Sequence, residues 1–337
     1  MIRVAIDAMG GDFAPAAPVA GTALALADGA HDFHVQLVGP TDAIESELAK
    51  QGIADRSRIE IVEAPEVIGM GEKPLQAVRG KRKSSIALGL GIQKEGKSDA
   101  FISAGNTGAV MAASTLILKL YPGFERPAIG TPFPTVNHDL PVLVLDAGAN
   151  VDCAPEELVG FAHLGQVYAR DAWGRPDPVV ALLNIGEEEE KGNAAAKEAH
   201  RMLAQCGLKF IGNVEGRDIV MGRCERGPFD VVVCDGFVGN VLLKFYESVA
   251  RLVLHLAERE LGTEFVQSDG VRHLFKHLDY AAYGGAPLLG VQGVSIISHG
   301  RSSPAAFRAA VRVAVEAARR HYVQHMDTEF AAGGVTS

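Results

Sequence analysis

Short apolar runs rich in β-branched residues alternate along this chain with longer segments rich in Ala, Leu and Glu. The strand-like runs are Ile2–Asp7, Phe33–Gly39, Ile59–Val62, Asp99–Ser103, Ile129–Thr135, Val142–Asp146, Val179–Asn184, Phe210–Val214, Val231–Asp235 and Val291–Ser298. The helical segments include Ala16–Ala27, Gly108–Leu120, Glu156–Arg170, Asn193–Gln205 and Pro304–His325. Alternating strands and helices are typical of an α/β fold with a mainly parallel sheet covered on both faces.

Six of the strand-like runs end in turns built from small and polar residues. The turns are Asp7–Asp12, Ser103–Gly108, Asp146–Asn150, Asn184–Asn193, Asp235–Asn240 and Ser298–Ser303. A strand that stops at such a turn and continues as a helix points backbone N–H groups at one edge of the sheet, where anions bind. We therefore expect one sheet edge to carry all six turns and the active site.

A proline-rich run and a long helix interrupt the alternation. Because proline cannot donate to a central ladder, the run Pro127–Pro141 predicts an edge strand or a crossover between lobes. A helix is predicted from about Val238 to Leu261, with apolar residues spaced alternately by four and three positions. Such a seam needs a neighbouring helix, either within the monomer or across a dimer interface.

The segment after this helix, Phe265–Tyr283, is amphipathic, with Leu274, Phe275 and Leu278 on its apolar stripe. Such a segment either lies on a bilayer surface or packs in the core or on a neighbouring subunit. We expect residues 238–285 to form a protruding helical element. The chain as a whole is predicted to be a single domain of two closely joined lobes over residues 1–330, with a flexible tail at residues 331–337.

Composition narrows the function classes. The 337 residues are 47% hydrophobic and 22% charged, with a formal net charge of −9. This balance allows a large core and argues against nucleic-acid binding, which needs a concentrated basic face. The four cysteines show neither CxxC nor zinc-finger spacing. Since the chain opens directly on the strand-like Ile2–Asp7 and has no apolar stretch of about 20 residues, we expect a cytoplasmic, soluble protein.

The turns offer anion-binding groups without a nucleotide signature, because neither GxGxxG nor GxxxxGK[ST] occurs. Ser103, Asn106 and Thr107 form the best phosphate cradle, and helix capping is their alternative role. Lys191 precedes a helix and would bring a positive charge to the phosphate, unless it is an ordinary surface lysine. Asn240 could donate to an oxyanion, and helix capping is its alternative role. His299 could protonate a leaving group, and a structural hydrogen bond is its alternative role.

No covalent catalyst can be identified in the sequence. It contains no GxSxG elbow, no cysteine with a motif-placed histidine and no HExxH motif. A mechanism in which a bound ligand is itself the nucleophile fits better than one with a covalent enzyme intermediate.

Six motifs, taken in order, resemble those of the bacterial phosphate acyltransferase family (PlsX). They are Ile6–Asp12 with Pro15, Ser103–Ala109, Asp146–Asn150, Asn184–Gly186 with Lys191 and Gly192, Ile211–Glu215, and Asp235–Asn240. The resemblance runs from Val4 to about Arg320. It implies a homodimer with a Rossmann-like, doubly wound α/β fold related to phosphotransacetylases and to isocitrate and isopropylmalate dehydrogenases.

The resemblance also implies the reaction and the partners. The enzyme would transfer a long-chain acyl group from acyl carrier protein to inorganic phosphate, giving acyl phosphate for phosphatidic acid synthesis without a metal or cofactor. It would contact the cytoplasmic membrane peripherally and could pass its product to a membrane glycerol-3-phosphate acyltransferase. The family lysine and asparagine that match Lys191 and Asn240 are implicated in activity.

Residues are predicted for three kinds of site besides the membrane contact. Lys191, Asn240 and His299 are predicted to be catalytic. The residues predicted to bind phosphate or substrate are Gly10, Gly11, Ser103, Gly105, Asn106, Thr107, Asp146, Asn150 and Asp235. Basic residues predicted to dock the acidic carrier protein are Arg79, Lys81, Arg82, Lys83, Arg251 and Arg259, although a solvated helix start also explains the first cluster.

Two positions depart from the family pattern, and other functions compete. Gly71 replaces a common acidic residue and Ile297 a frequent lysine, so no role is carried over to either. One alternative is a phosphotransacetylase-like enzyme acting on acyl-coenzyme A, and another is a non-catalytic membrane scaffold that binds acyl carrier protein. A dehydrogenase is disfavoured because GxGxxG is absent.

Overall fold

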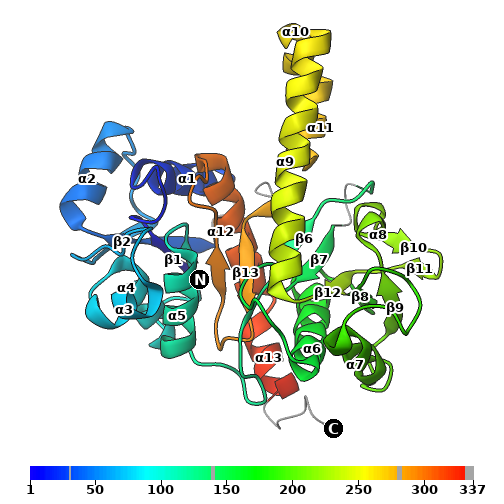
Figure 1. The fold of residues 1–337 in the computed structure, drawn as a ribbon. Helices are drawn as coiled ribbons and strands as arrows, with labels where there is room; N and C mark the ends of the chain where they lie inside the picture. Colours follow the sequence, from blue (N-terminus) through cyan, green and yellow to red (C-terminus); the bar gives the residue numbers. More distant parts are fainter. Residues whose placement is uncertain (30–31, 138–140, 279–282, 331–337) are drawn as a thin grey trace. The chain divides into compact units, whose positions relative to one another are not determined.

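The computed structural model describes residues 1–29, 32–137, 141–278 and 283–330 (Figure 1). The side chains of residue 273 and of residues 276–278, Leu278 among them, lie outside this description, as does the predicted flexible tail at residues 331–337. The chain divides into two compact units. Unit 1 comprises Met1–Pro127 and Tyr283–Thr336, and unit 2 comprises Ala128–Ala282.

The sheet of unit 1 is built around the N-terminal strand. Its order is β3 (Ile59–Glu63), β2 (Phe33–Gly39), β1 (Ile2–Asp7), β4 (Ala100–Ser103), β14 (Ser295–Ile297) and β13 (Ala286–Leu289). All neighbours are parallel except β13 and β14. Ile6 of β1 pairs with Ile102 of β4, and Ile102 pairs with Ile296 of β14. The carboxyl ends of these three neighbouring strands therefore meet at one edge.

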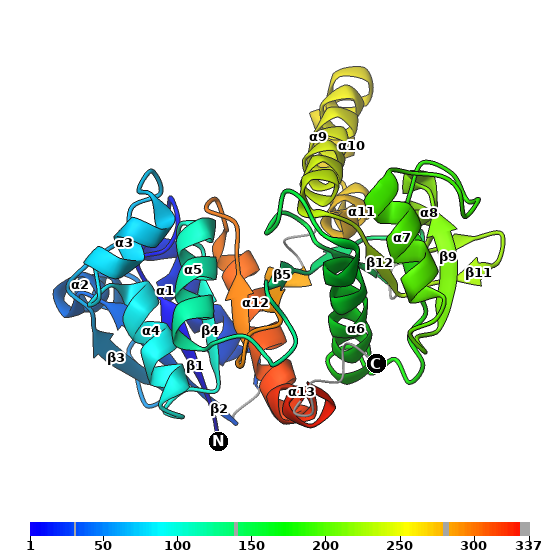
Figure 2. The same cartoon turned by 60° about the horizontal axis from the view of Figure 1, so that its bottom comes forward.

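Helices cover both faces of this sheet. On one face α1 (Ala16–Ala27) packs on α12 (Pro304–Arg319), where Gly21 leaves room for Phe307. On the other face lie α4 (Ser85–Lys94) and α5 (Thr107–Ile117) (Figure 2). Gly89 of α4 packs on the ring of Phe101. The remaining helices of the unit are α2 (Thr41–Lys50), α3 (Pro74–Gly80) and α13 (Tyr322–Phe330). Burial on both faces explains why the strands read as continuous apolar runs.

The sheet of unit 2 has five strands in the order β6 (Thr131–Phe133), β7 (Val142–Leu145), β12 (Val231–Val233), β8 (Val180–Leu183) and β9 (Phe210–Val214). It is parallel except for β6, which lies at the edge and contains Pro132. The edge strand predicted from the prolines is thus confirmed. A short strand, β5 (Ala128–Ile129), precedes β6.

Helices α6 and α9 pack on the sheet of unit 2. On one side α6 (Pro155–Asp171) packs closely, with Gly165 against the side chain of Val231. The first half of α9 (Gly236–Leu261) packs on a cluster that contains Val144 and Val232, through partly buried residues such as Leu242 and Tyr246. Smaller elements complete the unit: α7 (Ala194–Leu203), α8 (Gly216–Met221), β10 (Arg223–Cys224) and β11 (Gly227–Pro228).

The second half of α9 extends away from the sheet of unit 2, and α10 (Thr263–Gln267) and α11 (Asp269–Leu278) fold back beside it (Figure 1). This is the protruding helical element that the sequence predicted. Its predicted seam is only partly buried by the described residues: Leu242 packs on the unit 2 cluster, whereas Phe245 and Leu252 are 67% and 55% exposed. Packing inside the monomer thus holds for Leu242 and not for Phe245 or Leu252, and the predicted dimer interface stays a prediction.

Two further expectations need correction. The chain forms two main sheets, whereas one was expected, because β7, β12, β8 and β9 pair among themselves. The single helix predicted over Pro304–His325 is divided into α12 and α13, since the backbone at His321 takes a left-handed conformation with φ 55°.

Candidate active site

The six glycine-rich turns fall into two groups of three. Those after β1, β4 and β14 lie at the carboxyl edge of the unit 1 sheet, and those after β7, β12 and β8 lie at the corresponding edge in unit 2. The expectation of one shared edge was wrong because the strands divide between two sheets. Within each group the three strands are parallel neighbours, so the turns of a group lie side by side.

In unit 1 a buried aspartate holds two of the turns together. The Asp7 carboxylate accepts hydrogen bonds from Ser103 Oγ at 2.7 Å and from the Met9 backbone N–H at 3.1 Å. Ser103 Oγ in turn accepts the N–H of Gly105 at 3.0 Å. Burial raises the pKa of Asp7, and Ser103 is fully buried. The Ser103 hydroxyl therefore organises the turn; its predicted contact with phosphate stays a prediction.

Close backbone approach explains the two glycines of the first turn. A Cβ at Gly10 would lie 2.8 Å from the backbone nitrogen of Gly105. Gly11 has φ +103°, and the next residue, Asp12, donates its N–H to the carbonyl of Gly300 at 2.7 Å. Through these contacts the turns after β1, β4 and β14 interlock.

The amide of Asn106 is used within the fold. Its Oδ1 caps α5 by accepting the N–H of Ala109 at 3.1 Å, and its Nδ2 donates to the carbonyls of Met70 and Glu72 at 2.9 and 3.1 Å. Helix capping, the alternative considered for this residue, is thus present. Thr107, the first residue of α5, is exposed.

His299 is exposed in the turn after β14, and its Nδ1 accepts the backbone N–H of Arg301 at 3.1 Å. This contact assigns the proton of the neutral ring to Nε2. His299 belongs to unit 1, whereas Lys191 and Asn240 belong to unit 2. Its predicted role as a proton donor remains untested.

In unit 2 the carboxylate of Asp146 organises the turn after β7. Its Oδ1 accepts the N–H groups of Ile129, Gly148 and Ala149 at 2.9–3.1 Å. Its Oδ2 accepts the backbone N–H of Asn150 at 2.7 Å and the Asn150 side-chain amide at 2.9 Å. Burial raises the pKa of Asp146, and the backbone hydrogen bonds oppose that rise. Asp146 and Asn150 are both buried and bonded to each other.

The first turn of α9 lies directly on this loop. Asp235 caps the helix by accepting the N–H of Val238 at 2.8 Å, and Gly236 donates its N–H to the carbonyl of Asn150 at 2.7 Å. A Cβ at Gly239 would overlap the carbonyl oxygen of Asp146. The glycine therefore allows the helix to approach, and the exposed side chain of Asn240 follows it.

Lys191 lies at the end of the turn after β8. Asn184 Nδ2 donates to the Lys191 carbonyl at 3.0 Å, and Asn193 caps α7 by accepting the N–H of Ala196 at 2.8 Å. The Lys191 side chain passes beside Gly186, where a Cβ would lie 3.0 Å from its Cγ. Lys191 is exposed, two residues before the cap of α7. Its backbone is fixed while its charge faces solvent.

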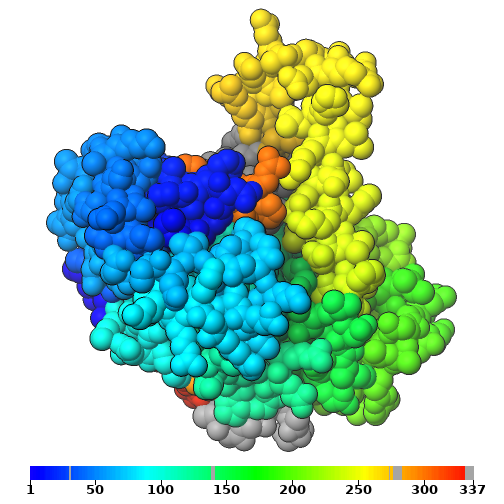
Figure 3. All heavy atoms as spheres, turned by 60° about the vertical axis from the view of Figure 1, so that its left-hand side comes forward, coloured from blue at the N-terminus to red at the C-terminus, as the bar shows by residue number. Residues whose placement is uncertain are grey.

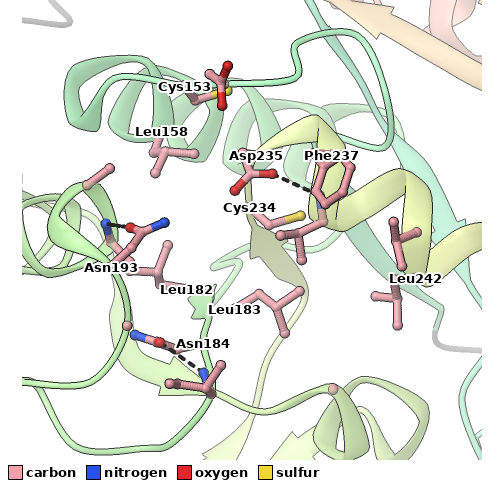
Figure 4. A pocket seen from close by; sticks show the side chains of 18 of the residues that line it. Cys153, Leu158, Leu182, Leu183, Asn184, Asn193, Cys234, Asp235, Phe237 and Leu242 are labelled. Carbon is pink, nitrogen blue, oxygen red and sulfur yellow. Dashed lines mark hydrogen bonds between the residues drawn. The ribbon is translucent and has the colours of Figure 1, made fainter.

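A pocket of about 550 Å³ opens in unit 2 between the ends of β8 and β12 and the first turns of α7 and α9 (Figure 4). Leu158, Leu182 and Cys234 form buried parts of its wall, and Phe237 and Phe245 are exposed beside it. The sequence pattern does not indicate this pocket. Its only signal was the apolar face at the start of α9, which was interpreted as part of a helix seam.

Two thiols line the pocket, and neither is a nucleophile at neutral pH. Burial raises the pKa of Cys153 to about 12 and also raises that of Cys234. Because the thiolate is the reactive form of cysteine, both side chains stay protonated and unreactive. This agrees with a reaction in which the ligand itself is the nucleophile.

The predicted docking residues lie in both units. Around α3 of unit 1, sky-blue in Figure 3, Arg79, Arg82 and Lys83 are exposed, whereas Lys81 pairs with Glu72 at 2.5 Å. In unit 2 the exposed helix α9 carries Arg251 and Arg259, and Arg259 pairs with Glu260 at 2.6 Å. Two of the six cations thus form ion pairs, and the docking role of these six residues stays a prediction.

On α11, Leu274 is 49% exposed and Phe275 is half-buried; the Leu278 side chain lies outside the described residues. None of the helices in the described ranges is both long and apolar enough to cross a membrane. In the same part of the chain, no three His, Cys, Asp or Glu side chains are grouped to hold a metal ion.

Comparison with known proteins agrees with the motifs. The pattern of the family described as "Fatty acid synthesis protein" matches residues 2–325. A phosphate acyltransferase from Nostoc punctiforme is 45% identical, with 98% of this chain and 96% of the relative covered. The phosphate acyltransferase from Heliobacterium modesticaldum is 46% identical, with 96% of each chain covered.

Solved structures support the predicted fold class. A phosphotransacetylase from Streptococcus pyogenes superposes with a TM-score of 0.64 at 16% identity, over 94% of each chain. A 4-hydroxythreonine-4-phosphate dehydrogenase from Burkholderia phymatum gives a TM-score of 0.50 at 15% identity, over 95% of this chain and 98% of its own. At these identities the likeness shows the shared Rossmann-like, dehydrogenase-type fold alone.

Proposed function

The chain belongs to the fatty acid synthesis protein family, with phosphate acyltransferases as its relatives, and we propose that its acyl donor is a long-chain acyl-acyl carrier protein. The protein is an acyltransferase, and phosphate is the acceptor. The proposed product is an acyl phosphate that supplies phosphatidic acid synthesis. The reaction requires only these two substrates.

The proposed chemistry is direct attack by phosphate on the thioester. A phosphate oxygen bonds to the carbonyl carbon, a tetrahedral oxyanion forms, and the carbon–sulfur bond breaks. Since hydrogen phosphate carries a proton into the reaction, that proton ends on the departing thiol, and the atoms balance without an added acid. The protein must orient phosphate, exclude water and stabilise the oxyanion.

The observation that carries the proposal is the arrangement of the unit 2 turns. Gly239 lets α9 approach the Asp146 loop, so the exposed amide of Asn240 lies at the start of the second turn of a helix whose cap is fixed by Asp235. We assign Asn240 to the oxyanion, because an amide donates there without titrating. Lys191, exposed before α7, is assigned to phosphate, which both its charge and the positive end of that helix attract.

In the unit 1 turns, fewer groups than expected from the sequence are proposed to bind phosphate. The side chains of Ser103 and Asn106 are already bonded within the fold, so any phosphate contact from this loop would come from the exposed Thr107 or from backbone N–H groups. His299 remains the residue proposed to pass the proton of hydrogen phosphate to the leaving sulfur. Its Nε2 is the ring atom that would carry the proton.

The proposed partners follow from charge and exposed apolar surface. Acyl carrier protein is acidic, and the cations proposed to receive it are the exposed Arg79, Arg82, Lys83 and Arg251. The exposed apolar residues in the second half of α9, among them Leu252, Val253 and Leu256, are proposed to face a second copy, and α11 is proposed to touch the inner face of the cytoplasmic membrane.

The donor is tested by comparing palmitoyl-acyl carrier protein with palmitoyl-coenzyme A at equal concentration and saturating phosphate. The proposal predicts a higher kcat/KM for the carrier protein, and predicts that Arg82→Glu with Lys83→Glu lowers it only for that donor. Equal or better use of the coenzyme A thioester by the wild type would instead support the phosphotransacetylase-like alternative.

A further inference from the structure

We propose that the unit 2 pocket binds the acyl chain of the donor, and that α7 and α9 set the chain length the enzyme accepts. This inference rests on the proposed function and assigns a substrate site within it. The pocket volume of about 550 Å³ falls within the range of roughly 300–1,000 Å³ that is typical of sites for small organic ligands.

The chemistry of the wall selects an apolar ligand. Leucines from three elements line it, namely Leu158 of α6, Leu183 of β8 and Leu242 of α9 (Figure 4). Among the described residues, the charged members of the lining are Asp152 and Asp235 alone, and no lysine or arginine of this part of the chain lines the pocket. A phosphate or nucleotide would meet two carboxylates and no positive charge to balance its own. A hydrocarbon chain is uncharged and needs no such charge from the wall.

The polar side chains at the pocket are already engaged in turns and caps. Asn184 bonds to the Lys191 carbonyl and to the N–H of Ile185. Asn193 and Asp235 cap α7 and α9. Because their hydrogen bonds hold the surrounding backbone, they fix the shape of the entrance and leave the apolar wall to hold the ligand.

Burial gives the pocket a direction. Leu158, Leu182 and Cys234 are 4%, 1% and 4% exposed, whereas Phe237, Val241 and Phe245 on α9 are 61%, 54% and 67% exposed. A chain therefore enters past the α9 side chains with its methyl end toward the leucines. The two phenylalanines offer apolar contact to the chain before it is fully inserted.

The pocket lies beside the proposed catalytic groups. Its lining includes Gly192, the residue after Lys191, and Phe237, one helical turn before Asn240. A chain seated in the pocket would leave its thioester carbonyl at the start of α9. The first two turns of this helix thus contribute to both the chain site and the oxyanion site.

The test uses two neighbouring alanines at the start of α7. Ala195 lines the pocket, whereas Ala194 is exposed and does not line it, so Ala195→Phe fills the site and Ala194→Phe is the matched control. Val241→Trp fills the pocket from α9 and guards against a local defect in α7. Acyl-carrier-protein donors from butyryl to palmitoyl are assayed with phosphate, and binding of butyrate and laurate is measured by calorimetry.

The wild type and Ala194→Phe should gain up to about fourfold in kcat/KM per added methylene until the pocket is full, corresponding to about 0.8 kcal/mol. Ala195→Phe and Val241→Trp should lose at least about 50-fold with palmitoyl donors, if three methylenes are displaced, and stay near wild type with butyryl donors. They should also bind laurate at least about tenfold more weakly than the control.

The two proposals fail in different ways. Unchanged laurate binding and an unchanged chain-length profile in both filled variants would overturn the acyl-chain pocket while leaving acyl transfer intact. Turnover of every donor by the wild type without any need for phosphate would overturn the proposed function, and calorimetry would still decide the pocket.

Discussion

Gly148 and Asn240 lie against each other at the start of α9: a Cβ at position 148 would be 3.4 Å from Asn240 Cβ and 3.5 Å from its Oδ1. The loop after β7 therefore supports the Asn240 side chain directly. Because Asp146 fixes that loop through five hydrogen bonds, the amide is held without being buried. A supported, exposed amide is what stabilisation of an oxyanion requires.

Replacing Asn240 tests this role. Asn240→Ala should lower kcat by about 10²- to 10³-fold, the usual cost of removing one oxyanion donor, with little change in the KM for phosphate. Steady-state kinetics give both constants. Lys244→Ala, one turn further along α9, where the exposed lysine pairs with the largely buried side chain of Glu247, should keep wild-type kcat. A kcat for Asn240→Ala within a factor of two of wild type would remove the residue from the mechanism.

Asp146→Asn should destabilise unit 2. The carboxylate accepts hydrogen bonds on both oxygens, whereas an amide offers one oxygen and turns its NH₂ toward the remaining donors. Each buried donor left without a partner costs about 1–3 kcal/mol, so the free energy of unfolding should fall by at least about 2 kcal/mol. Urea unfolding followed by the fluorescence of Trp173, the single tryptophan, measures it.

The control for this variant is Asp177→Asn, which removes an exposed ion pair with Lys209 and should cost less than about 1 kcal/mol. Equal stability of Asp146→Asn and wild type would show that the loop does not depend on the carboxylate.

A methyl group at Gly239 should prevent α9 from approaching its loop, because the added Cβ would overlap the Asp146 carbonyl oxygen. Gly239→Ala is therefore expected to lower both thermal stability and activity. Gly270→Ala, on α11 with open space around its Cβ, should be neutral or stabilising by up to about 1 kcal/mol. Circular dichroism melts give the melting temperatures of both variants. Equal melting temperatures would show that the close approach of Gly239 to the Asp146 carbonyl does not matter for stability.

The pocket thiol Cys153 should be inert across the neutral range. Since burial raises its pKa to about 12, the thiolate fraction stays small up to pH 9 and grows only as the pH approaches that value. Iodoacetamide should therefore leave activity intact between pH 6 and pH 9, and Cys153→Ser should remain active. Rapid inactivation that tracks modification of Cys153 by mass spectrometry would point to a thiolate in the site.

Local features of the sequence predicted local structure well. The bounds of β1 and α1 match the predicted Ile2–Asp7 and Ala16–Ala27, and α9 begins two residues before its predicted start. Periodicity, caps and glycine turns depend on neighbours in the sequence, which are visible there. The family motifs followed from the same turns.

Long-range pairing could not be predicted. β14 joins β4 across nearly 200 residues, and β7 pairs with β12 in a separate sheet, so the division of the six turns between two units depends on partners that no local pattern names. The engagement of Ser103 and Asn106 within the fold has the same origin, since their partners Asp7 and Met70 are distant in sequence. The pocket could not be predicted because its wall combines residues from several elements that are distant in the sequence.

The enzyme is proposed to transfer the acyl group from acyl carrier protein to phosphate, and Lys191 is proposed to bind that phosphate. The most direct measurement is the release of free acyl carrier protein from palmitoyl-acyl carrier protein, with and without phosphate, for wild type, Lys191→Ala and the exposed control Lys197→Ala. Release by the wild type and the control should require phosphate and yield acyl phosphate, and Lys191→Ala should need far more phosphate or turn over far more slowly. Release that is equally fast without phosphate, or unaffected by Lys191→Ala, would contradict the account.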